Sequence, residues 1–137
     1  MVVVLDINAL LVSIPKKSPY RLIFDALISG QVELVLTNEI LSEYIEILQR
    51  KANGNVAVNI AETLLNLRRL RKLGIYFQWN LIEKDPDDNK YVDAAVAGSA
   101  DYLITNDQHF NILKSVTFPK VNIISIDSFL DLIKTLS

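Results

Sequence analysis

The architecture follows from Val2-Val3-Val4-Leu5-Asp6, an unbroken apolar run that ends on an acid. Short runs of β-branched and apolar residues without charge are typical of strands that are buried on both faces of a parallel sheet. Similar runs recur along the chain, at residues 32–36, 75–77, 102–104 and 121–126. The sequence therefore predicts about five short strands, the first of which covers residues 2–5.

Amphipathic segments separate these runs. Helical periodicity predicts helices over residues 19–29, 38–51, 55–73, 88–100 and 128–136, with a short turn near residues 110–114. Gly30 and Gly74 each precede a strand run and are expected to end helices. Alternating strands and helices imply right-handed crossovers, so we expect an α/β fold, a three-layer α/β/α sandwich around a parallel sheet of about five strands.

Length and composition limit the classes of protein that fit. The 137 residues suit a single domain over residues 1–137, and the absence of cysteine excludes disulfides and thiolate metal sites. A net charge of −2 argues against a basic nucleic-acid coat. The apolar start reaches Asp6 too soon for a signal peptide, and no apolar run approaches the ~20 residues of a membrane span. We therefore expect a cytoplasmic protein that does not contact membranes.

Acidic and small polar residues follow the predicted strands. Asp6 directly follows the first strand, and Thr105 and Asp107 follow the fourth. Glu43 lies one turn into the helix after the second strand, at the edge of its apolar stripe. Because the carboxyl ends of parallel strands meet at one edge of the sheet, these side chains are expected to converge there.

Helical phase selects among the acids that begin the fourth predicted helix. Val92 and Ala95 belong to a face of small residues that is able to lie on the sheet, and Asp88 heads that face. Asp93 falls to one side of the face and is a further metal-ligand or supporting candidate. Asp87 points about 100° away from Asp88 and is expected to act as a turn acid.

Each of these acids also has a purely structural interpretation. Asp6 is a possible helix cap, and Glu43 is a possible member of a solvated helix face. Asp107 is a possible turn residue, and Asp127 is expected to cap the last helix. His109 is the only histidine and is expected to be an exposed loop side chain rather than a general base.

A metal site is the chemistry that the functional interpretation predicts. Asp6, Glu43, Asp88 and Asp107 have no cationic side chain evidently placed to neutralise them, so they would repel one another without a bound cation. An all-oxygen set selects Mg²⁺ or Mn²⁺, and one or two such ions support hydrolysis of phosphate esters. Lys16, Lys17 and Arg21 are the candidates for contact with an RNA backbone. The basic residues at 68–72 are expected to form an ordinary exposed helix face.

Four motifs together resemble the PIN domain, and within it the toxins of prokaryotic toxin–antitoxin pairs. They are Val4-Leu5-Asp6-Ile7-Asn8, Leu41-Ser42-Glu43-Tyr44, Asp85-Pro86-Asp87-Asp88-Asn89-Lys90 and Ala100-Asp101-Tyr102-Leu103-Ile104-Thr105-Asn106-Asp107. The resemblance covers nearly the whole chain in the right order. It implies a Mg²⁺- or Mn²⁺-dependent ribonuclease that cleaves single-stranded RNA. It also implies a protein antitoxin encoded alongside and, in many members, a homodimer.

The resemblance assigns site residues one by one. The four family acids correspond to Asp6, Glu43, Asp88 and Asp107, although Asn89 or Asp93 also aligns with the third acid if a small gap is allowed. Asn8 and Thr105 take the supporting polar positions. Two positions depart from the family pattern, because Ile7 stands where many members have threonine or serine and Asn106 stands where this branch often has glycine.

Two other functions remain open at this point. One is an interaction module for nucleic acid or protein that keeps the fold without turnover. The other is a Mg²⁺-dependent phosphatase or phosphoreceiver domain, which also gathers acids at strand ends. A dehalogenase-type phosphatase requires a second aspartate where Asn8 stands, and a receiver requires an aspartate and a lysine where Asn80 and Asp127 stand.

Overall fold

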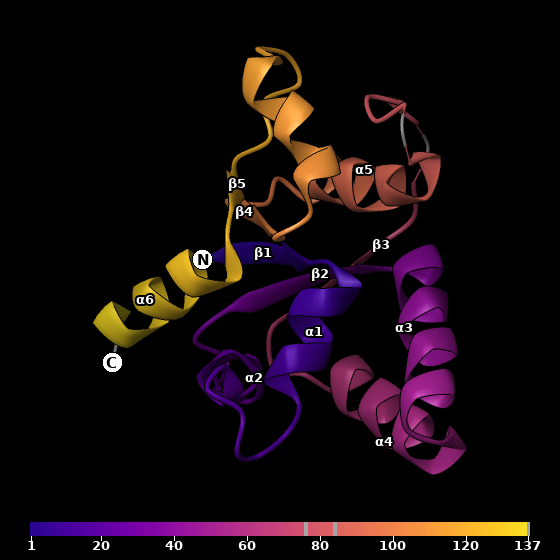
Figure 1. The fold of residues 1–137 in the computed structure, drawn as a ribbon, viewed down its shortest axis with the longest axis vertical. Coiled ribbons are helices and arrows are strands. Elements are labelled where there is room, and N and C mark those ends of the chain that lie inside the picture. Colours follow the sequence, from indigo (N-terminus) through magenta and orange to yellow (C-terminus); the bar gives the residue numbers. More distant parts are fainter. Residues whose placement is uncertain (76, 84, 137) are drawn as a thin grey trace.

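The computed structural model describes residues 1–75, 77–83 and 85–136, and its centre is a five-stranded parallel sheet. The strands are β1 (Val2–Leu5), β2 (Glu33–Thr37), β3 (Leu70–Leu73), β4 (Tyr102–Ile104) and β5 (Ile123–Ile124). They lie in the order β3-β2-β1-β4-β5 (Figure 1). This confirms the predicted α/β class with a parallel central sheet.

Helices cover both faces of the sheet. The helices are α1 (Ile7–Ser13), α2 (Arg21–Ser29), α3 (Asn38–Lys51), α4 (Gly54–Leu65), α5 (Asn89–Ala97) and α6 (Ile126–Leu136), with 3₁₀ segments η1 (Pro86–Asp88) and η2 (Gln108–Ser115). In Figure 1, α5 lies on one side of the sheet and α1, α2 and α6 lie on the other. Helices α3 and α4 pack against each other beside the β3 edge.

Local sequence explains where the elements begin and end. The central strands β1 and β2 are almost entirely buried, as a sheet covered on both faces requires. Helix α3 spans the predicted residues, and its cap is Thr37, whose hydroxyl accepts a hydrogen bond from the backbone N of Ile40 at 3.2 Å. Gly30 ends α2 in the left-handed conformation, with φ of 81°, as predicted.

The third strand and the helix before it differ from the prediction. Helix α4 ends at Leu65 rather than at residue 73, and residues 70–73 form β3 instead of 75–77. The predicted strand at 75–77 falls partly on residue 76, which lies outside the described residues, and its neighbours on either side are not in a strand. Among the described residues, β3 pairs with β2 alone and is an edge strand of the sheet. Edge strands tolerate charged residues, and the resulting mixture of charged and apolar residues also fits the periodicity of a helix. Arg71 is paired there with Glu33 at 2.6 Å, so the basic cluster is not a helix face.

Smaller differences affect the other elements. Helix α1 was not predicted, because its seven residues are too few for helical periodicity to show. Gly74 follows β3 and therefore does not end a helix. Strand β5 is shorter than the predicted 121–126, and α6 begins at Ile126. Asp127 consequently lies in the first turn of α6, where its carboxylate accepts a hydrogen bond from the Tyr20 hydroxyl at 2.8 Å.

The strand order reverses direction between β1 and β4. From β1 the chain builds outward through β2 to β3, and it then returns to place β4 and β5 on the other side of β1. In open α/β sheets ligand sites form at such a reversal, at the carboxyl ends of the strands. Within the described ranges, no helix has both the length and the apolar character that crossing a bilayer requires.

Candidate active site

The carboxyl end of β1 carries Asp6, which is almost completely buried. Its Oδ1 accepts a 2.8 Å hydrogen bond from the backbone N of Ala9 and so caps α1. Its Oδ2 accepts a hydrogen bond from the Thr105 hydroxyl, which follows β4. Burial raises the pKa of the Asp6 carboxyl, and the nearby charges of Asp107 and Glu43 raise it further, against the two hydrogen bonds that lower it. The capping role is therefore real, but it does not account for the whole environment of Asp6.

Thr105 connects the acids at the ends of β1 and β4. Its Oγ1 donates to Asp6 and accepts a 3.0 Å hydrogen bond from the backbone N of Asp107. Asp107 in turn caps η2, because its Oδ1 accepts from the backbone N of His109 at 2.9 Å. Asn106 between them holds the start of α6 through a 2.9 Å bond from the backbone N of Ile126. The segment after β4 is thus held to the end of β1 through Thr105 and to the start of α6 through Asn106.

Glu43 reaches the site from α3 and is held by two residues of α5. The Tyr91 hydroxyl donates a hydrogen bond to Glu43 Oε1 and accepts one from the backbone N of Ile7 at 3.1 Å. The Lys90 ammonium lies 3.0 Å from Glu43 Oε2, and only 11 % of the Lys90 side chain is exposed. The expectation that no cation accompanies the acids is therefore wrong, because Lys90 comes from the helix that Asp88 begins.

Asp88 is the least satisfied of the acids. Its Oδ2 is buried and has no hydrogen-bond partner among the described residues. Burial raises the pKa of Asp88 to about 7, the charges of Asp85, Asp107 and Glu43 add to the rise, and Lys90 opposes it. An orphaned buried carboxylate oxygen is uncommon, and an ion that binds there would satisfy it.

The His109 side chain lies close to the carboxylates of Asp85, Asp88 and Asp107. Its Nδ1 is 3.6 Å from Asp107 Oδ1 and 3.9 Å from an oxygen of both Asp85 and Asp88. One ligand atom from each of Asp85, Asp88 and His109 lies within 4.8 Å of the other two. The His109 side chain is 42 % exposed, as predicted, but it also lies close to three carboxylates.

The four acids predicted from the sequence come together. Asp107 and Glu43 both raise the pKa of Asp6, and both also raise that of Asp88. We refer to Asp6, Glu43, Asp88 and Asp107 as the acidic cluster. Their segments are separated by up to about one hundred residues in the chain, and they meet where the strand order reverses.

Within the described residues, neither Asp93 nor Asn8 makes a hydrogen bond or ion pair with the acidic cluster. Asp93 Oδ1 accepts a 3.0 Å hydrogen bond from the backbone N of Trp79, so it anchors the segment after β3. Burial raises the pKa of Asp93, and the neighbouring charge is Glu39 rather than a member of the cluster. Asn8 is exposed and lines a groove of about 400 Å³ beside Leu11.

The basic candidates also lie away from the acids. Lys16 and Lys17 are exposed and follow α1, which leads away from Asp6 by about 10 Å over its seven residues. Arg21 is already engaged, with its Nε 3.0 Å from Asp25 and its guanidinium also donating to the carbonyl of Ile14. Contact between these three residues and RNA stays a prediction.

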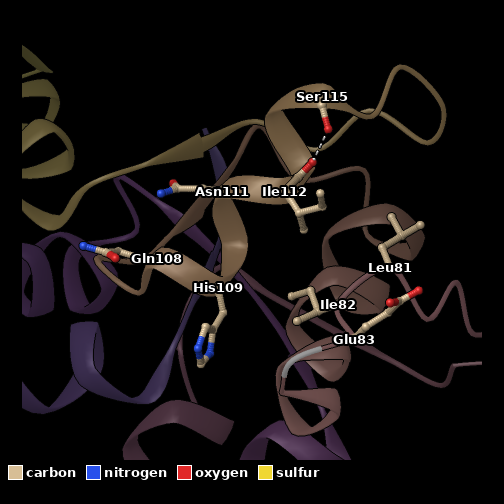
Figure 2. A pocket seen from close by; sticks show the side chains of 8 residues that line it. All are labelled: Leu81, Ile82, Glu83, Gln108, His109, Asn111, Ile112 and Ser115. Carbon is tan, nitrogen blue, oxygen red and sulfur yellow. Dashed lines mark hydrogen bonds between the residues drawn. The ribbon is translucent and has the colours of Figure 1, made fainter.

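A cavity opens beside the acidic cluster. It has a volume of about 800 Å³ and lies between residues 81–83 and η2. Figure 2 shows Ile82 and Leu81 facing Ile112 across it, with His109 extending from η2. Because His109 also contacts the acids, the cavity adjoins the acidic cluster.

Sequence reasoning did not identify Lys90, Tyr91 or His109 as parts of this site. A signal was present for the first two, because Lys90 and Tyr91 follow Asp88 by two and three residues, within the first turn of the same helix. Their contacts with Glu43 depend on how α3 packs against α5. Such packing does not show in the periodicity of either helix.

Comparison with known proteins agrees with this arrangement. The family model of the PIN domain matches residues 2–109, most of the chain. The chain belongs to the PIN-domain family. Among solved structures, VapBC2 from Rickettsia felis, bound to a DNA fragment from their promoter, is similar with a TM-score of 0.63 at 14% identity, covering 91% of this chain and 98% of that chain. VapBC-1 from nontypeable Haemophilus influenzae is similar with a TM-score of 0.60 at 18% identity, covering 93% and 99%. These likenesses concern the fold, and a search of curated proteins finds no match.

The residues of this PIN domain fit a hard divalent cation. The acidic cluster offers only oxygen ligands, and the chain has no cysteine. The orphaned Oδ2 of Asp88 is a buried oxygen that a bound cation would satisfy. Mg²⁺ and Mn²⁺ are the ions that such a set selects.

Proposed function

We propose that this chain is a Mg²⁺- or Mn²⁺-dependent endoribonuclease that hydrolyses single-stranded RNA and acts as the toxin of a toxin–antitoxin pair in the cytoplasm. The observation that carries the proposal is the buried, unpartnered oxygen of Asp88, together with the charges of Asp107 and Glu43, which act on both Asp88 and Asp6. Membership of the PIN-domain family supports the nuclease assignment. The toxin assignment is supported by the fold shared with VapBC assemblies, which are toxin–antitoxin complexes.

Some residues of the site would bind the metal ions, and others orient the residues that bind them. Asp6, Asp88, Asp107 and Glu43 would hold one or two divalent ions, which when bound supply an activated water and stabilise the leaving oxygen. Asp93 stays a weaker ligand candidate, because its carboxylate is occupied by the backbone of Trp79.

Three polar residues hold the acids in place. The Thr105 hydroxyl orients Asp6, and the Tyr91 hydroxyl orients Glu43. Lys90 lowers the pKa of Asp88 and so favours the ionised form that binds a cation. Asn8, which the family pattern places in a supporting role, is proposed to act only at the rim, since its side chain is exposed.

Cleavage of a labelled single-stranded RNA tests the enzymatic part. We expect cleavage with Mn²⁺ or Mg²⁺, none in EDTA, and a loss of at least about 100-fold in Asp6→Asn. Asp131→Asn is the matched control, because Asp131 is exposed on α6, and it should cleave like wild type. Equal cleavage by wild type and Asp6→Asn contradicts the proposal. Binding of RNA without cleavage favours the interaction module, and release of phosphate from a monoester favours the phosphatase.

Expression in bacteria tests the toxin part. Production of the chain alone should arrest growth, and co-expression of a short gene found beside it should restore growth and yield a complex that purifies together. Asp6→Asn should be harmless yet still bind that partner. Growth arrest that the adjacent gene product does not relieve contradicts the antitoxin assignment. The proposed homodimer is checked separately by sedimentation of the purified chain.

A further inference from the structure

Three aromatic side chains form a cluster in which two of the rings are exposed. Phe77 and Trp79 lie edge to face with ring centroids 4.6 Å apart, and Trp79 and Phe118 do so at 5.7 Å. Phe77 is 63% exposed and Phe118 is 81% exposed. In an edge-to-face pair, the ring that contributes its edge keeps both faces clear of its partner. We refer to Phe77, Trp79 and Phe118 as the aromatic cluster.

The aromatic cluster is fixed to the helix that carries part of the site. The backbone N of Trp79 donates to Asp93 of α5, and the Asn89 amide makes two 2.9 Å hydrogen bonds to the backbone N and O of Ile82. Asn89 directly follows Asp88 of the acidic cluster. The segment that presents Phe77 and Trp79 is therefore positioned by the same helix as the acids.

The cavity of about 800 Å³ lies along the same two segments. One wall, residues 81–83, follows Trp79, and the other wall, η2, precedes Phe118. His109 lines this cavity and lies within 3.9 Å of Asp88. Figure 2 shows His109 extending from η2 at this cavity, whose other wall begins two residues after Trp79.

Exposed lysines lie at the end of η2 and after it, on the side of the aromatic cluster that carries Phe118, whereas Asp93 lies at the backbone of Trp79. Lys114 and Lys120 are exposed, and Lys120 stands two residues after Phe118. Within the described part of the chain, neither lysine is paired with a carboxylate. Glu83 is the acidic residue that lines the cavity. An unpaired cation two residues from an exposed ring suits single-stranded nucleic acid, in which bases stack and phosphates are neutralised.

We propose that the aromatic cluster is a base-stacking platform that binds bases of a single-stranded RNA beside its cleaved phosphate. The proposal rests on the proposed ribonuclease function and adds to it the residues that hold the nucleobases. Stacking on aromatic rings accepts any base, so the platform gives affinity for unpaired RNA with little sequence preference. Lys120 contacts the backbone of the same strand.

Binding in EDTA tests the platform without any cleavage. Trp79 is the only tryptophan, so its fluorescence reports directly on the cluster. The probes are a ten-nucleotide oligouridylate and an oligomer of the same length made of abasic ribose phosphates. We expect the oligouridylate to quench Trp79 and the abasic oligomer to bind weakly without quenching. Equal binding and equal quenching by the two oligomers overturn the proposal.

Substitutions separate stacking from charge and from folding. Phe118→Ala should weaken oligouridylate binding about 5- to 100-fold, the range that loss of one stacked base gives. Phe118 is so exposed that its removal should leave the thermal melt unchanged, and Leu22→Ala, at another exposed apolar residue, is the matched control. Lys120→Gln should weaken binding of both oligomers alike. If Phe118→Ala binds oligouridylate as tightly as wild type, the proposal is overturned. It is also overturned if the wild-type chain self-associates through Phe118, that is, if Phe118→Ala abolishes the self-association and oligouridylate does not affect it.

A substrate without a base distinguishes failure of the platform from failure of the nuclease. With Mn²⁺, cleavage of the abasic oligomer should be unchanged in Phe118→Ala and lost in Asp6→Asn. Phe118→Ala should cleave RNA less efficiently than wild type because its KM rises. If wild type hydrolyses neither substrate, the ribonuclease function fails, and the quenching experiment still decides whether the aromatic cluster stacks bases. Equal loss of both activities in a folded Phe118→Ala overturns the platform.

Discussion

Asp88 is a residue whose buried carboxylate lowers the stability of the fold and is also a proposed metal ligand. Its buried Oδ2 has no hydrogen-bond partner among the described residues, and burial with neighbouring carboxylates raises its pKa to about 7. An acid whose pKa is higher in the folded state than in the unfolded state binds protons preferentially when folded. The contribution of Asp88 to stability is therefore present at low pH and is lost as the pH rises from about 4 to about 7.

Replacing this carboxylate by its neutral amide tests that sign. In EDTA at pH 8, Asp88→Asn should raise the free energy of unfolding by about 1 kcal/mol, because a buried charge and its repulsion from Asp85 and Asp107 are removed. At pH 4 the difference should nearly vanish, since the wild-type acid is then protonated. Urea denaturation across pH 4–8 measures this, with Asp131→Asn as the control. A destabilised Asp88→Asn at pH 8 would show that the carboxylate is needed for folding.

Tyr91 is the residue whose hydroxyl joins Glu43 to the backbone of Ile7. Tyr91→Phe keeps the ring against Phe110 and removes only the hydroxyl. We expect a loss of about 1–2 kcal/mol of stability, because the backbone N of Ile7 loses its partner. RNA cleavage should fall about tenfold or more, as kcat rather than KM. Denaturant melts and steady-state kinetics measure the two effects, and unchanged kcat would show that Glu43 does not need this bond.

At the scale of elements, the end of α5 lies close against β2. Gly98 ends α5, and a Cβ built there would lie 2.9 Å from both methyl carbons of Val35. Gly98→Ala should therefore destabilise the fold by about 1–3 kcal/mol through overpacking. Gly54→Ala is the matched control, because nothing lies within 4 Å of a Cβ at Gly54. Chemical denaturation compares the two, and equal stability would mean that α5 shifts freely on the sheet.

The same scale shows what the sequence could predict. Phase along α5 separates Asp88 from Asp87 because a helix that lies on a sheet has one contact face, and that face carries Val92 and Ala95. Strand β3 could not be found in this way. Its Leu70 and Leu73 are spaced as on a helix, and only pairing with β2 and the Arg71 contact to Glu33 determine its conformation. The contacts of Lys90 and Tyr91 with Glu43 are long-range in the same sense, because they join α5 to α3.

For the whole molecule, the acidic cluster couples metal binding to global stability. A ligand that binds only the folded state stabilises it by about 2.7 kcal/mol at one hundred times its dissociation constant. Adding Mn²⁺ should therefore raise the melting temperature of wild type by several degrees and leave Asp6→Asn nearly unchanged. Asp131→Asn should respond like wild type. Differential scanning fluorimetry measures this, and an equal rise in Asp6→Asn would show that Mn²⁺ binds elsewhere.

The hydrogen bond between Asp6 and Thr105 joins residues that are translated far apart in time. During synthesis on the ribosome, the nascent chain exposes Asp6 long before Thr105 and Asp107 exist, and β4 must emerge before it can pair with β1. No N-terminal fragment that stops short of β4 contains all four acids. A ribosome-attached chain therefore has no complete acidic cluster until Asp107 has been made, so the proposed ribonuclease would leave its own message intact while the earlier codons are read.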